Sequence, residues 1–119
     1  MNDDVAYLID IQNAIARIQS YTTGGPSEFH KNTLIQDGVL RNLETIGEAV
    51  KNLSAELRNE SPHVPWKSIA GLRDILIHRY FDVNFNQVWG VVDKHLPPLS
   101  AAIKDLLVSR AGDFDPSDA

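Results

Sequence analysis

Apolar side chains recur at three- and four-residue steps along almost the whole chain, and no other feature of the sequence constrains the fold as much. The first segment shows this spacing clearly, with aliphatic residues at Val5, Leu8, Ile11, Ile15 and Ile18. Such a period places apolar side chains on one face of an α-helix, whereas a half-buried strand needs strict alternation. The sequence therefore predicts an all-α protein, an up-and-down bundle of four to five helices.

Helix-breaking residues divide the first half of this pattern into segments. Asn2 or Asp3 is expected to cap the first helix, and TTGGP at 22–26 ends it. A short turn or helix is expected over 27–32. A second, long helix is then expected over 33–58.

The second half of the chain is divided in the same way. The segment 59–65 reads as a loop, and a further helix is expected over 66–81, with a break near Gly71. Asn84 has the side chain and the position of a helix cap. The last helix follows it and is expected to kink at the prolines 97–98, because proline lacks the backbone N–H that a helix needs.

Size and composition predict one domain over 1–110, followed by a flexible acidic tail at 111–119. No apolar run approaches the roughly 18 residues that a membrane span needs. The acidic start, MNDDVAYLID, lacks the features of a signal peptide, and the chain contains no cysteine. These features suit a cytoplasmic protein without disulfides or thiolate metal sites.

The charge is negative in total but unevenly distributed. A formal net charge of −5 argues against binding nucleic acid by bulk attraction, since that affinity comes from neutralising phosphates. The segment 61–80 is the exception: Lys67, Arg73 and Arg79 stand against the single Asp74, a balance of +2. An anion site is therefore expected in this segment.

The same segment contains RDILIHRY, in which polar residues interrupt an apolar helix. With 3.6 residues per turn, Asp74 and His78 share one face, and Arg73 and Tyr80 share another. Arg73 and His78 lie about 140° apart on the helical wheel. A helix this apolar is expected in the core or between subunits, so its polar groups need partners.

Two interpretations of this stretch are open. In the first, Arg73 pairs with Glu44 or Glu48 and His78 hydrogen-bonds within the core, because a buried arginine needs a charge partner. In the second, Arg73 binds a phosphate bidentately and His78 moves a proton near neutral pH, which is the minimum for metal-independent cleavage of RNA. One helix projects the two groups in different directions, so the second interpretation predicts a homodimer that brings two copies together.

Three stretches resemble the HepT-like branch of the HEPN domains: RNLETIGEAVKNL at 41–53, PWKSIAGLRDILIHRYF at 65–81 and VWGVVDKHLPPL at 88–99. The resemblance covers nearly the whole chain. Its most specific part is Arg73-x4-His78-x-Tyr80, which follows IAGL.

The resemblance implies a prokaryotic toxin that acts as a metal-independent endoribonuclease without a cofactor, with RNA as its substrate. Arg73 and His78 would be catalytic in a cleft between two protomers, and Asp74 would orient His78. Such toxins are typically encoded beside an MntA-type nucleotidyltransferase, the antitoxin of a type VII-like pair. That partner transfers AMP from ATP to the motif tyrosine, which is Tyr80 here, and the added charge and bulk would block RNA.

Other polar residues near the motif have two interpretations each. Glu44 and Glu48, four residues apart, form either a carboxylate or metal pair or, as we favour, ion pairs with nearby cations such as Arg73. Arg79 is either a phosphate contact or a solvated charge. Trp66 is expected to anchor the core or a dimer interface rather than to stack on a base.

A non-catalytic function is the alternative. In it the same helices form a dimer that docks a nucleotidyltransferase and holds a nucleotide in its cleft. The net charge of −5 and the carboxylate of Asp74 favour this alternative, because both oppose RNA phosphates.

Overall fold

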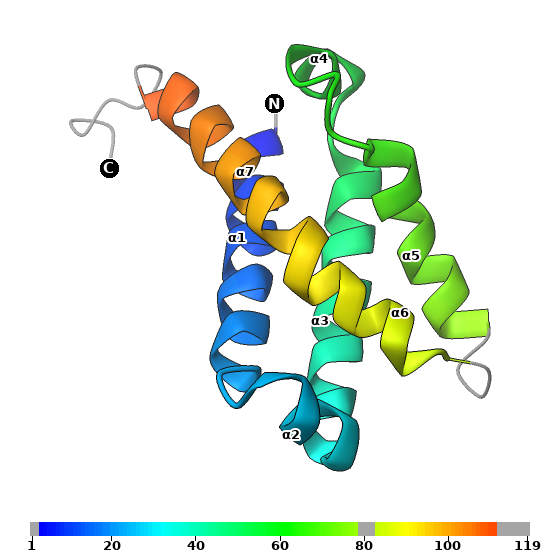
Figure 1. Ribbon diagram of the computed structural model, residues 1–119. Coiled ribbons are helices and arrows are strands. Elements are labelled where there is room, and N and C mark those ends of the chain that lie inside the picture. The colour runs from blue at the N-terminus through cyan, green and yellow to red at the C-terminus, as the bar shows by residue number, and fades with distance from the viewer. Residues whose placement is uncertain (1–2, 79–82, 112–119) are drawn as a thin grey trace.

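The structure, a computed structural model, describes residues 3–78 and 83–111, with 73–78 and 111 described as backbone only. Every regular element in this part of the chain is helical, which confirms the predicted all-α bundle (Figure 1). The elements are, in chain order, α1 (Asp4–Tyr21), α2 (Gly25–Lys31), α3 (Thr33–Asn52), α4 (Ala55–Glu60), α5 (Trp66–His78), α6 (Phe85–Gly90), the π-helical segment η2 (Val91–His95) and α7 (Leu96–Ala111). The acidic tail expected at 111–119 lies outside the described residues, except for the last residue of α7.

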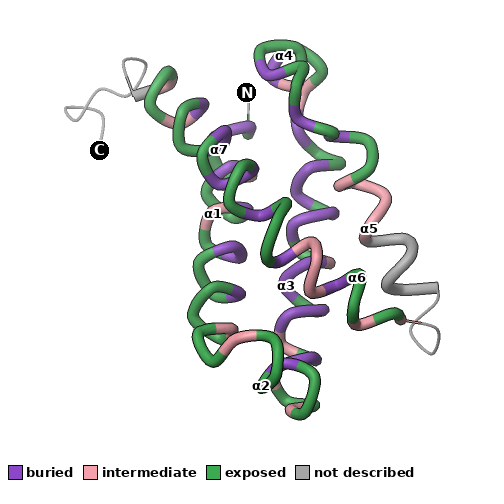
Figure 2. Tube along the Cα trace, in the orientation of Figure 1, coloured by how far each residue is buried: buried purple, intermediate pink, exposed green. Residues whose placement is uncertain are grey.

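Helix α3 lies at the centre of the bundle, with α1 and α5 packed against it and α7 packed on α1 (Figure 1). Buried residues concentrate on the sides of α1 and α3 that face the interior (Figure 2). Val5, which belongs to the expected apolar stripe of the first helix, lies outside this core at 42% exposure, and Leu34 of α3 is 80% exposed. None of the helices that the structure describes is long and apolar enough to cross a membrane.

The expected helix over 33–58 is wrong, because the chain forms two helices there. Ser54 adopts an extended conformation (φ −66°, ψ 153°) between α3 and α4, and its hydroxyl oxygen accepts a hydrogen bond from the N–H of Leu57 at 3.1 Å. The carboxylate of Asp4 accepts hydrogen bonds from the Ser54 N–H at 2.9 Å and from the Ser54 hydroxyl at 2.6 Å. A serine held in this way starts a new helix rather than continuing the old one. Asp3, expected as a cap, makes no side-chain cap hydrogen bond to the described start of α1.

Helix α2 begins at Gly25, earlier than expected, and the left-handed φ of 82° at this residue is one that glycine adopts readily. The fully buried Phe29 of α2 packs against Phe85 and Trp89, with ring centroids 6.0 Å and 5.3 Å away. This aromatic cluster fixes the start of α6. Asn84 caps that helix as predicted, because its side chain accepts hydrogen bonds from the N–H groups two and three residues on, at 3.0 and 3.3 Å.

Helix α5 starts at Trp66, which is 7% exposed and therefore a core residue. Its indole N–H donates to the carbonyl oxygens of Arg58 at 3.1 Å and Ser61 at 3.0 Å, which ties α5 to α4. The helix continues through Gly71 without the expected break. A glycine inside a helix costs only about 1 kcal/mol, and packing against α3 offsets that cost. The expected end at Phe81 lies outside the described residues.

The last helix departs from regular geometry before its prolines rather than at them. The π-helical segment η2 ends two residues before Pro97. A proline ring clashes with the carbonyl four residues earlier, which is that of Asp93 for Pro97 and that of Lys94 for Pro98. A wider helical turn at these carbonyls relieves the clash. The expected kink is therefore replaced by a π-helical segment upstream.

Candidate functional site

Helix α5, which carries the RDILIHRY stretch, runs alongside α3 in the opposite direction (Figure 1). Ile69 and Leu72 of α5 line the same cavity as Leu43 and Ile46 of α3. Since Leu72 and Leu43 share this cavity, the next position of α5 lies near the level of Glu44. The packing of α5 against α3 therefore sets the position of the motif along the axis of the central helix.

The structure places Arg73, Asp74 and His78 in the C-terminal half of α5, where it describes the backbone. The helix is regular there, so positions 74 and 78 lie one turn apart, and positions 73 and 78 lie about 140° apart around the axis. Arg79 and Tyr80 lie outside the described residues. One α5 helix thus does not bring the arginine and histidine positions to one face, and their convergence in a shared site stays a prediction.

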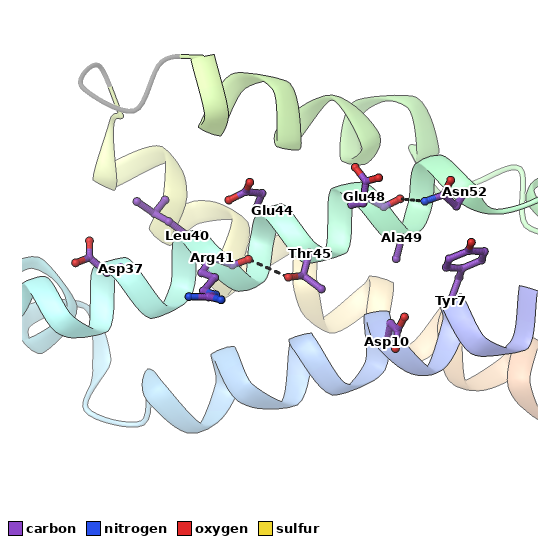
Figure 3. Close-up of a pocket in the computed structure, with 10 residues that line it drawn as sticks. All are labelled: Tyr7, Asp10, Asp37, Leu40, Arg41, Glu44, Thr45, Glu48, Ala49 and Asn52. Carbon is purple, nitrogen blue, oxygen red and sulfur yellow. Dashed lines mark hydrogen bonds between the residues drawn. The ribbon is translucent and has the colours of Figure 1, made fainter.

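Glu44 and Glu48 of α3 point towards α5 (Figure 3). The Glu44 side chain is half-buried and that of Glu48 is exposed. The two carboxylates lie one helical turn apart on the side of α3 that faces the motif helix. This is the arrangement expected of ion-pair partners for Arg73, and the ion pair itself stays a prediction.

An open groove of about 670 Å³ extends from these glutamates along α3 and reaches α1 (Figure 3). Its charged lining residues are Asp10 of α1 and Asp37, Arg41, Glu44 and Glu48 of α3. The described lining of this α3 groove, four carboxylates and one guanidinium, has a formal charge of −3. Such a lining disfavours phosphate groups.

The groove could be found only partly from the sequence. Polar residues at three- and four-residue steps along α3 signal an exposed helix face; they are Asp37, Arg41, Glu44, Glu48 and Asn52. The contribution of Tyr7 and Asp10 has no such signal, because it depends on how α1 packs against α3.

The cavity lined by Leu43, Ile46, Ile69 and Leu72 has a volume of about 390 Å³, extends to the η2–α7 segment and is mainly apolar. His63 and His95 also line it, and both have exposed side chains. Among residues 3–72 and 83–110, whose side chains the structure describes, no three His, Asp or Glu side chains gather as a set that could hold a metal ion.

An all-α bundle in which the motif helix packs along the central helix defines a HEPN-like helical domain. A family model described as "Ribonuclease HepT-like" matches residues 11–106. The chain therefore belongs to the HepT-like ribonuclease family, which confirms the resemblance seen in the sequence.

Individual relatives agree with the family match. The chain is 39% identical over 113 residues to "putative RNase MJ0127" of Methanocaldococcus jannaschii, covering 94% of this chain and 93% of that protein. It is 38% identical over 101 residues to "probable ribonuclease HepT" of Thermococcus cleftensis, covering 84% and 92%.

A longer relative is "gamma-glutamylcyclotransferase and putative RNase MJ0434" of Methanocaldococcus jannaschii. It is 41% identical to the chain over 109 residues, which make up 90% of this chain and 49% of that protein. The chain thus spans about half the length of this relative. No solved structure matches the chain significantly.

Proposed function

We propose that the chain is a metal-independent endoribonuclease, a homodimeric toxin of the HepT kind that a nucleotidyltransferase antitoxin neutralises. One observation carries the proposal: the family match spans residues 11–106 and includes α5, on which Arg73 and His78 stand in a segment of net positive charge. The names of the relatives, which refer to RNases, support the same substrate class.

In the proposed reaction the 2′-hydroxyl of the RNA attacks the adjacent phosphorus. A neutral His78 accepts the proton of that hydroxyl as the O2′–P bond forms. Arg73 stays charged and binds the non-bridging oxygens, which stabilises the charge on the phosphorane. The P–O5′ bond then breaks, and the partner's His78, in its protonated form, gives a proton to the leaving 5′-oxygen. The products are a 2′,3′-cyclic phosphate and a 5′-hydroxyl.

The dimer follows from the geometry of α5. Positions 73 and 78 lie about 140° apart on one helix, so a single copy cannot direct both side chains at one phosphate. Two copies related by a two-fold axis would bring both arginines and both histidines into one cleft, where they act on the same phosphate. Each protomer then supplies half of the catalytic centre.

Three further residues complete the proposal. Asp74 lies one turn before His78 and would orient its imidazole. Tyr80 would receive AMP from the antitoxin, which adds negative charge beside the site and excludes RNA. Arg79 lies between His78 and Tyr80 in the sequence and would contact an RNA phosphate.

The test is cleavage of a labelled RNA by purified protein in the presence of EDTA. Wild-type protein is expected to give 2′,3′-cyclic phosphate ends, and His78→Ala and Arg73→Ala are each expected to lower the rate at least about 100-fold. Intact RNA with wild-type protein, together with growth arrest that His78→Ala does not relieve, would overturn the proposal. AMP transfer is read separately, as a mass increase after incubation with the antitoxin and ATP that Tyr80→Phe abolishes.

A second candidate function is a non-catalytic dimer that docks the nucleotidyltransferase. The α3 groove favours it, because a surface of formal charge −3 suits a basic protein partner better than RNA. In this case the protein leaves RNA intact but still binds the nucleotidyltransferase, and substitution of His78 does not weaken that binding.

A further inference from the structure

A hollow of about 460 Å³ lies at the corner where α4 leads into α5, which we call the α4–α5 corner. It is lined by Arg58 and Asn59 of α4 and by Trp66, Lys67 and Ser68 of the first turn of α5, among others. The two hydrogen bonds from the Trp66 indole to backbone carbonyls hold α4 and α5 in this arrangement. The corner is therefore a fixed feature of the fold rather than a chance contact of long side chains.

Neither cation of this corner forms an ion pair with a residue that the structure describes. The Arg58 side chain is half-buried, and its Nε atom is buried without a hydrogen-bond partner. Arg110, by contrast, is paired with Glu60. Arg58 also lines the hollow, and a guanidinium has further N–H groups besides Nε that can donate to an anion bound there.

The corner differs in charge from the α3 groove and from the cavity beside His63 and His95. Among the described residues, the lining of the corner includes two cations and no carboxylate, a formal charge of +2. The described lining of the α3 groove has a formal charge of −3, and the cavity beside His63 and His95 is mainly apolar. Of these three hollows, the corner suits a phosphate best.

The start of α5 adds further donors for such an anion. The first N–H groups of a helix have no partner within the helix and carry partial positive charge. Lys67 and Ser68 belong to this first turn of α5 and line the corner. A phosphate at this point would meet two cationic side chains, a hydroxyl group and the end of a 13-residue helix.

The register of α5 connects the corner to the catalytic motif. Positions 67, 71, 74 and 78 recur at steps of four, three and four residues, so they fall on one stripe of the helix. The half-buried Gly71 has no side chain, and a Cβ atom there would meet no described atom within 4 Å, so there is space for a strand beside the helix at this position. The eleven residue-to-residue steps from Lys67 to His78 span about 16 Å along the axis. An oligonucleotide can bridge that distance, whereas a mononucleotide cannot.

We propose that the α4–α5 corner binds a backbone phosphate of the RNA substrate, several nucleotides from the bond that is cleaved. Arg58 and Lys67 neutralise this phosphate, and the strand passes beside the helix at Gly71 towards His78. The inference rests on the proposed ribonuclease function, and it adds a binding subsite on a single protomer. It makes affinity depend on the length of the RNA.

The experiment measures binding of fluorescent oligoribonucleotides to protein carrying His78→Ala, so that the RNA stays intact. Lys67→Gln and Arg58→Gln are each expected to weaken binding of an oligonucleotide of about ten nucleotides roughly tenfold. Each should also make the plot of log affinity against log salt less steep, by about 0.7 in the magnitude of its negative slope. A dinucleotide is too short to reach the corner, so both substitutions should leave its binding unchanged.

Matched controls remove one positive charge elsewhere. Lys104→Gln on α7 and Arg17→Gln on α1 replace exposed cations outside the corner. They are expected to change affinity less than twofold. Gly71→Glu is expected to weaken binding of the long oligonucleotide through the bulk and charge of the new side chain. Circular dichroism shows whether each variant is folded.

The outcomes separate this inference from the proposed function. If wild-type protein cleaves RNA and the corner variants behave like the controls, the subsite is refuted and the nuclease stands. If RNA binds with the expected dependence on Lys67 and Arg58 but is never cleaved, the subsite stands and the nuclease fails. If the protein neither binds nor cleaves RNA, both fail. Inorganic phosphate or ATP that binds at the corner as tightly as the long oligonucleotide would refute the assignment to RNA.

Discussion

Replacement of Asp4 by alanine is expected to destabilise the protein by about 3 kcal/mol, because its carboxylate joins α1 to the start of α4. Asp4 is 3% exposed and accepts hydrogen bonds from the Ser54 N–H at 2.9 Å and the Ser54 hydroxyl at 2.6 Å. Each hydrogen bond to a charged group contributes about 1.5–3 kcal/mol. The two bonds share one donor residue, and the half-buried Ser54 regains some hydrogen bonding to water, so their sum is reduced to about 3 kcal/mol.

The assay is urea unfolding followed by far-UV circular dichroism, with all variants at one protein concentration because dimerisation couples stability to concentration. Asp3→Ala is the matched control: Asp3 is the exposed neighbour without a cap hydrogen bond to the described start of α1, and its loss should change stability by less than about 0.5 kcal/mol.

A double-mutant cycle isolates the interaction itself. Ser54→Ala also removes the cap of α4, which costs about 1 kcal/mol, so the single substitutions are not equivalent. The coupling energy between Asp4→Ala and Ser54→Ala is expected to be about 2 kcal/mol. A coupling energy near zero, or a loss below about 1 kcal/mol for Asp4→Ala, would refute the reasoning.

Three further predictions concern the helices that build the site. Gly71→Ala should stabilise the protein by about 0.5–1 kcal/mol in thermal unfolding, because the position is helical and open; destabilisation would show that this face of α5 is in contact. Asn84→Ala should cost about 1 kcal/mol through loss of the α6 cap, whereas Asn86→Ala, two residues further along and inside the helix, should cost less than half as much. Phe29→Ala should cost about 3–5 kcal/mol in urea unfolding, because this side chain is fully buried; Leu34→Ala, at 80% exposure, should cost less than about 0.5 kcal/mol.

Helix positions in this protein could be predicted from periodicity because each depends on residues close in sequence. The break between α3 and α4 could not, since Asp4, which holds Ser54, lies 50 residues away. The π-helical segment η2 was also missed, because the steric effect of a proline acts on the carbonyl four residues earlier. The expected break at Gly71 failed for the opposite reason: a local propensity of about 1 kcal/mol is too small to overcome packing against α3.

The candidate site was predictable to the extent that it lies on one helix. The spacing of Glu44 and Glu48 predicted that they share a face, and both point towards α5 (Figure 3). The α4–α5 corner had no such signal, because Arg58 and Lys67 belong to different helices. They line one hollow only through the intervening loop and the hydrogen bonds of the Trp66 indole.

The distribution of charge reconciles a net charge of −5 with RNA as the proposed substrate. Screening at physiological salt has a length of about 8 Å, so a phosphate responds mainly to charges within one or two helical turns. A phosphate at the α4–α5 corner meets Arg58 and Lys67 with no carboxylate among the described lining residues, whereas one in the α3 groove meets a formal charge of −3. Under the proposed function, the groove therefore disfavours a misplaced strand. Under that function, the carboxylates of the groove would favour RNA on the stripe of α5 that includes Gly71 and His78, where Asp74 is the one carboxylate among positions 67, 71, 74 and 78.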